Sequence, residues 1–195
     1  MVLGTIVNTI TIIIGSFIGI IIKGGLKEKY KNIIMQALAL CVFFVGASST
    51  LSGMQDENAE PILFIISLVI GSVIGTKIDI DKKLSNLGEK LQNKFGKNEG
   101  GFSQGFVTAS LVFCIGTMAI LGSIQSGISG DHTTLFVKSV LDGVSSIVFA
   151  STFGIGVTFS AVTVFVYQGL ITMLAVFIGP YITSDMLREI NIVGG

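Results

Sequence analysis

The stretch ILFIISLVI at residues 62–70 decides the class of fold, because every residue in it except Ser67 is apolar. A strand of a transmembrane barrel would alternate polar and apolar residues, and this run does not. A helix needs about 20 mainly apolar residues to cross a bilayer, and six stretches meet or nearly meet that length: residues 4–22, 33–53, 61–78, 105–124, 134–156 and 157–179. The sequence therefore predicts an all-α, polytopic helical membrane bundle of about six transmembrane helices, with residues 1–195 as a single transmembrane domain.

The composition supports a membrane protein and argues against several other classes. Half of the 195 residues are apolar, only 12% are charged, and the mean hydropathy is +0.84, whereas about a quarter of an ordinary soluble domain is charged. The formal net charge is zero, which gives no reason to expect a nucleic acid as a partner. With one histidine, two cysteines in apolar runs and no familiar catalytic motif, we expect no metal site, no cofactor and no enzymatic activity.

The lysines predict which way the chain is oriented, because cytoplasmic connections carry an excess of basic residues. The first and third connections between the apolar stretches hold ten of the twelve basic residues, at positions 23, 27, 29, 31, 77, 82, 83, 90, 94 and 97. The second connection holds only acids, at positions 56, 57 and 60. We therefore expect the first and third connections in the cytoplasm and the N-terminus outside.

The third connection carries a helical pattern of its own. Leu84, Leu87, Leu91 and Phe95 recur at three- and four-residue spacing, and lysines occupy other positions around the same helix. Residues 81–95 are therefore predicted to form an amphipathic helix on the cytoplasmic membrane surface. Such a helix would anchor the protein, or it would serve as a surface for regulation or for docking a partner.

Two copies of a glycine motif suggest close helix packing and an internal repeat. The sequence G-S-x-I-G occurs at residues 15–19 and again at residues 71–75. Small residues at this spacing let helix backbones approach each other in a membrane, so Gly15, Gly19, Gly71 and Gly75 are candidate packing residues, within one chain or between chains. The helix pairs 4–53 and 61–124 would then form a parallel repeat.

The fourth and fifth stretches contain the polar residues that point to function. Glycines and hydroxyls at residues 114–127 would weaken the helix near its end, which a membrane tolerates where backbone lines protein or a wet cavity. Asp142 is the only acid inside a predicted span, and Lys138 precedes it by one helical turn. A carboxylate at this depth must be paired, protonated or in contact with water. Two interpretations therefore stand: a structural ion pair, or a site for a solute, an ion or a proton.

A resemblance to a known family rests on several of these segments. They are GTIVN (residues 4–8), GSFIG (15–19), CIGTMAILGSIQSG (114–127), KSVLDG (138–143), SIVFAS (146–151) and YQG (167–169). Together they resemble the YqgA/YdfK-like family of small bacterial inner-membrane proteins, a domain of unknown function. The resemblance covers nearly the whole chain and implies a bacterial plasma-membrane location and a transporter-like role. Family members usually continue beyond the final glycine pair into another apolar span, so we expect a seventh span in an intact chain, with its C-terminus inside.

The leading hypothesis is a transporter or channel for a small polar solute or ion, acting as a homo-oligomer because six helices barely enclose a path. Its site would lie between the first, fourth, fifth and sixth spans. The candidate binding residues are Asn8, Gln125, Lys138, Asp142, Ser145, Ser146 and Gln168. Asp142 would bind a cation or proton, and the uncharged residues would supply hydrogen bonds. The alternative is a non-transporting scaffold or regulator that acts through the lysine-rich helix at residues 81–95.

Overall fold

The computed structural model describes residues 2–22, 26–57, 59–79, 82–83, 86–87, 89–90 and 101–194. Within these residues the fold is helical and contains no strand. The helices are α1 (Leu3–Ile21), α2 (Glu28–Met54), α3 (Pro61–Ile78), α5 (Phe102–Cys114), α6 (Thr117–Ile128), α7 (Thr133–Phe153), α8 (Gly156–Ile178), the short 3₁₀ turn η1 (Gly179–Tyr181) and α9 (Ser184–Gly194). The amphipathic helix predicted over residues 81–95 lies largely outside the described residues.

The predicted number of spans agrees with the structure, with one correction. Among the described residues, α1, α2, α3, α7 and α8 are each long and apolar enough to cross a membrane, and α5 with α6 makes a sixth crossing if the pair is one span. That fourth span is bent by 58° between its two helices. The sequence predicted weakened helix near the end of this span, but the break lies at Ile115 and Gly116, close to its middle.

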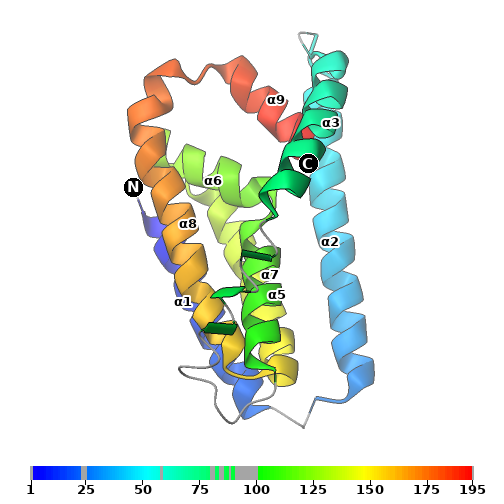
Figure 1. Ribbon diagram of the computed structural model, residues 1–195. Coiled ribbons are helices and arrows are strands. Elements are labelled where there is room, and N and C mark those ends of the chain that lie inside the picture. Colours follow the sequence, from blue (N-terminus) through cyan, green and yellow to red (C-terminus); the bar gives the residue numbers. More distant parts are fainter. Residues whose placement is uncertain are drawn as a thin grey trace.

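The helices divide into a tight bundle and a loosely attached hairpin (Figure 1). Helices α1, α5, α6, α7 and α8 pack around apolar side chains such as Ile12, Phe113 and Val164. Helices α2 and α3 stand to one side of that bundle. Of their described side chains only Gly53 is buried, so the apolar residues of this hairpin are available to lipid.

Helix α9 joins the hairpin to the bundle at one end of the molecule (Figure 1). Thr50 donates a hydrogen bond from its hydroxyl to the carbonyl oxygen of Ile192 at 3.1 Å, and the Ile192 side chain fills the space beside Gly53. The Arg188 Nη1 atom lies 3.4 Å from Oδ1 of Asp56, which is in the connection between α2 and α3. No element was predicted for this segment, because α9 is too short to resemble a span.

Helices α1 and α7 run in the same direction and pack closely along much of their length. A Cβ added at Gly15 would overlap Ser146 Oγ and the carbonyl oxygen of Gly143, and one added at Gly19 would overlap the carbonyl oxygen of Ile147. Gly15 and Gly19 therefore pack within the chain. In the described part of the chain, nothing lies within 4 Å of a Cβ added at Gly71 or Gly75. The two copies of the motif thus have different surroundings.

Candidate functional site

The break between α5 and α6 places two helix ends about midway along the fourth span, at the exposed residues Ile115 and Gly116. Gly116 has φ 142° and ψ 146°, a backbone conformation that side chains rarely allow, so a glycine is required there. Ile115 before it is extended, and α6 then begins at Thr117. In the described structure no side chain caps this new N-terminus. The break therefore places a helix N-terminus, with its partial positive charge, partway along a span, and the Ala119 N–H in its first turn donates to the Gly116 carbonyl at 3.1 Å.

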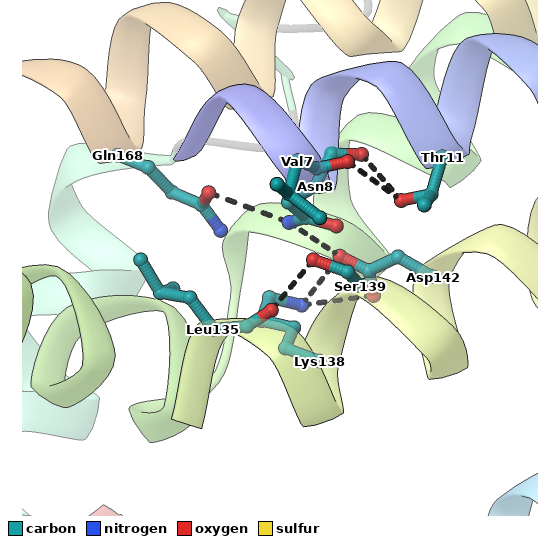
Figure 2. A network of polar contacts seen from close by, with 8 residues as sticks. All are labelled: Val7, Asn8, Thr11, Leu135, Lys138, Ser139, Asp142 and Gln168. Atoms are coloured by element: carbon teal, nitrogen blue, oxygen red, sulfur yellow. Dashed lines mark hydrogen bonds and ion pairs between the residues drawn. The ribbon is translucent and has the colours of Figure 1, made fainter. Parts of the chain in front are cut away.

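Beside this break lies the buried ion pair of Lys138 and Asp142 (Figure 2). The Lys138 Nζ is 2.9 Å from Asp142 Oδ1 and 2.9 Å from Oδ2. Lys138 is 7% exposed and Asp142 5% exposed. Their spacing of one helical turn predicted that they could pair, and the structure shows the pair formed.

Polar side chains of the first and sixth spans, α1 and α8, extend the hydrogen-bond network of this pair. Asn8 on α1 donates from Nδ2 to Asp142 Oδ2 at 3.0 Å and to Gln168 Oε1 on α8 at 3.3 Å (Figure 2). Asn8 and Gln168 are both fully buried. Asn8 Oδ1 and Gln168 Nε2 have no partner among the described residues. Because buried amides are normally paired, these two atoms mark a gap in the buried hydrogen-bond network.

A cavity of about 580 Å³ extends from this pair to the end of the bundle where α7 begins. At its deep end lie the buried residues Lys138, Asp142 and Ser145, and the exposed break at Ile115 and Gly116 also lines the cavity. At its other end lie Thr133 and Thr134 at the start of α7, and Gln125, which accepts a hydrogen bond from the Thr134 hydroxyl at 2.8 Å. The α2 residues Val42, Val45, Gly46 and Ser49 form the remaining wall. The ion pair is thus both internally paired and reached by a cavity.

Apolar packing occupies the bundle beyond the deep end of the cavity. The ring of Phe149, one turn after Ser145 on α7, lies 6.0 Å from the ring of Phe113 and 6.5 Å from that of Phe153. Ala150, Val157 and Ala161 belong to the buried core at the same end of the bundle. Apolar side chains therefore fill this part of the bundle, and none of the three phenylalanines lines the cavity.

The structure distributes the predicted site residues over three places. Gln125, Lys138, Asp142 and Ser145 line the cavity, and Asn8 and Gln168 support the pair from behind. Ser146 faces α1 instead, because it packs beside Gly15 and donates to the Gly143 carbonyl at 2.7 Å. The site was expected between the first, fourth, fifth and sixth spans, and that expectation missed the wall formed by α2.

The turn before α7 is polar and is separate from the ion pair. The Thr133 backbone N–H donates to Asp131 Oδ1 at 2.9 Å and holds the pKa of that carboxyl below its usual value. Ser126 Oγ lies 2.8 Å from His132 Nδ1, which fixes the imidazole at the end of α6. Neither contact was predicted from the sequence. Both lie at the open end of the bundle, about two turns from Lys138 along α7.

These features define a polytopic α-helical membrane protein with a discontinuous helix and a buried ion pair beside it. Residues 3–195 match the family model described as "Protein of unknown function (DUF554)", and the chain belongs to that family. The family resemblance drawn from the sequence is thereby confirmed.

Two curated relatives show how far the similarity extends. The chain is 42% identical over 192 residues to "Uncharacterized membrane protein YdfK" of Bacillus subtilis (strain 168), covering 98% of this chain and 81% of the relative. It is 24% identical over 200 residues to "Uncharacterized protein YqgA" of Escherichia coli (strain K12), covering 100% of this chain and 83% of that relative. No solved structure matches the chain.

Proposed function

We propose that this protein is a transporter or channel for a small polar solute or ion in the bacterial plasma membrane. One observation carries the proposal: the buried Lys138–Asp142 pair forms the deep end of a cavity at a break in a spanning helix. Broken helices at membrane depth are tolerated where they line a cavity, and transporters use their free ends to contact substrate. A purely structural ion pair would require neither the cavity nor the break.

The block at one end favours a transporter over an open channel. Phe149 packs against Phe113 and Phe153 one turn beyond Ser145, and we propose that these rings close the cavity toward the opposite end of the bundle. The lysine distribution predicts that the open side faces the outside of the cell. Movement of a solute would then require the aromatic packing to open while the cavity closes.

Cysteine accessibility tests this one-sided access. In a background with Cys41→Ala and Cys114→Ala, single cysteines at Thr134, Ser145 and Ser151 would be exposed to a membrane-impermeant thiosulfonate on intact cells. We expect fast labelling at position 134, slower labelling at position 145 and none at position 151, which is 3% exposed beyond the cavity. Labelling only after the cells are opened would mean that the cavity faces the cytoplasm.

Flux into proteoliposomes tests transport itself. Stopped-flow light scattering would follow uptake of sodium and potassium salts, amino acids, short-chain carboxylates, sugars and polyols. We expect one solute class to enter through the wild-type protein and not through Asp142→Asn, with Asp131→Asn, an exposed acid at the cavity end, as the matched control. A double variant, Lys138→Gln with Asp142→Asn, avoids leaving a buried charge unpaired. Unchanged flux in both site variants would remove the ion pair from the mechanism.

We further propose that the working form is a homo-oligomer. The bundle is small, and α3 presents Gly71 and Gly75 with nothing packed against them in the described part of the chain. Small residues at this spacing support close helix association in lipid. Light scattering on detergent-solubilised protein would measure the number of chains, and a monomer at all concentrations would contradict this part of the proposal.

A further inference from the structure

We propose that the cavity binds a small organic anion, namely a carboxylate attached to a short apolar body, and that the Lys138 ammonium contacts the carboxylate. This inference rests on the proposed function and specifies its substrate class. It also changes the role expected for the ion pair. From the sequence, Asp142 was expected to bind a cation or proton, whereas here Lys138 binds the ligand. Hydrogen-bond capacity, the nearby helix end and the apolar walls support it.

Both oxygens of Asp142 are already engaged. Oδ1 accepts from Lys138, and Oδ2 contacts Lys138 at 2.9 Å and accepts from Asn8 at 3.0 Å. A cation entering the cavity would have to displace the Lys138 ammonium from Asp142. The ammonium is attached to the chain and loses no translational entropy in this contact, whereas a free cation would lose translational entropy on binding. Asp142 is therefore better placed to position Lys138 than to bind a free cation.

Lys138, in contrast, has one N–H donor that the ion pair does not use. An ammonium group has three N–H donors. Among the contacts of the described residues, Nζ meets only the two oxygens of Asp142. The side chain also lines the cavity, so the remaining N–H is available to an acceptor that enters there. An anionic acceptor forms the stronger bond, because both partners are then charged.

The start of α6 adds positive potential to the same cavity. Thr117, Met118 and Ala119 line it at the first turn of a twelve-residue helix that no described side chain caps. The N-terminus of a helix carries partial positive charge, which favours an anion. This charge offsets the cost of bringing an anion next to Asp142.

An apolar section of the wall limits what the anion is attached to. Val45, Leu121, Val137 and Leu141 line the space between the ion pair and the polar end at Thr134. A sugar or polyol would leave hydroxyl groups against these side chains without partners. A bare inorganic ion would leave the apolar space unfilled. A carboxylate with a short branched alkyl group matches both the charged end and the walls.

A set of matched compounds tests the inference on the purified full chain. The probes are 3-methylbutanoate, 3-methylbutylamine, 3-methylbutanol and leucine, which share one alkyl group and differ in charge. Binding would be measured as the shift in thermal midpoint by size-exclusion chromatography, and flux by proteoliposome uptake. We expect the carboxylate alone to raise the midpoint in a saturable way and to be taken up.

Variants tie the effect to Lys138. Lys138→Arg keeps a cation and should retain binding within about threefold, whereas Lys138→Gln with Asp142→Asn should weaken it at least tenfold while the unliganded protein still elutes as folded material. Preference for the amine, for leucine or for sodium or potassium ions would overturn the inference and leave transport standing. Carboxylate binding that the double variant does not weaken would also overturn it. Absence of both binding and flux for every solute tested would remove the proposed function as well.

Discussion

Helices α1 and α3 carry the same five-residue pattern and use it in different ways. At residues 15–19 the pattern brings the α1 backbone against α7, close enough that added side-chain atoms would overlap the carbonyl oxygens of Gly143 and Ile147. At residues 71–75 nothing described lies within reach of the two glycines. The motif therefore permits close packing without enforcing it, and the facing helix decides whether close packing occurs.

The close contact of α1 has a consequence for the site that the bare face of α3 does not share. Asn8 lies two helical turns before Gly15 on the same helix, and the parallel packing of α1 on α7 brings its amide to 3.0 Å from Asp142. A bulkier contact at residues 15–19 would move α1 away and open that hydrogen bond. On α3, in the part of the chain that the structure describes, Ser72 donates to the Leu68 carbonyl of its own helix.

The largest expected effect comes from Gly19→Leu. The new side chain would meet the carbonyl oxygen of Ile147, Ala150 Cβ and the backbone nitrogen of Ser151, and helix backbone cannot shift aside. Overpacking of this kind costs roughly 3 kcal/mol or more. We expect little folded protein by fluorescence-detected size-exclusion chromatography.

The matched control is Gly75→Leu, at the equivalent position of the open motif. It should keep the elution profile of the wild type and its thermal midpoint, with a change below about 0.5 kcal/mol, as for other open surface positions. A shift of Gly75→Leu to a smaller species would instead show that another chain covers α3. If Gly75→Leu reduced the amount of folded protein as much as Gly19→Leu, the two helices would not differ in how tightly their glycines are packed.

The next largest effect is expected from Asn8→Leu. The substitution removes the donor to Asp142 and leaves Gln168 Oε1 without its 3.3 Å bond, inside a fully buried site. Loss of a buried hydrogen bond to a charged group costs about 2–3 kcal/mol. Thr76→Val on α3 is the control, since its exposed hydroxyl bonds only to the Ser72 carbonyl of its own helix. A thermal midpoint that falls no further for Asn8→Leu than for Thr76→Val would show that α1 does not support the ion pair.

The sequence could predict the spans and the ion pair because both depend on local spacing. A long run of apolar residues indicates a membrane-spanning helix. Residues 138 and 142 share one helix face whatever else surrounds them. The bond between Asn8 and Asp142 joins positions 134 residues apart and depends on which helices pack together. The direction of Ser146 toward Gly15 depends on the same packing. Neither follows from periodicity within one segment.

The break at Gly116 and the wall formed by α2 escaped prediction for related reasons. Hydropathy is an average over about 20 residues, so a single glycine with positive φ inside an apolar run hardly changes it. Helix α2 has few polar residues in its cavity-facing part, and Ser49 is the polar side chain it contributes to the lining. Only the position of α2 beside α7 makes Val42 and Val45 part of the site.

A smaller effect is expected at the break, from Gly116→Ala. The residue has φ 142°, and nothing described lies within 4 Å of an added Cβ, so the cost is backbone strain without a clash. Strain of this kind costs about 1–3 kcal/mol. Gly71→Ala, a helical glycine with equally open space, should instead be neutral or slightly stabilising. Comparing their thermal midpoints separates strain at the site from the general effect of removing a glycine, and equal midpoints would mean that the break can relax.

The smallest effect is expected where α9 holds the hairpin, at Asp56→Asn. Asp56 lies 3.4 Å from Arg188, but its side chain is 42% exposed, and Arg188 also pairs with Asp185 at 2.8 Å. Exposed ion pairs contribute about 0.2–1 kcal/mol and weaken as salt rises. The thermal midpoint should therefore fall slightly at low salt and match the wild type at 1 M salt, where the Debye length is about 3 Å. A decrease in thermal midpoint as large as that of Asn8→Leu, and unchanged by salt, would show that α2 and α3 are held to the bundle as firmly as α1 is. The contrast between the two glycine motifs would then need another cause.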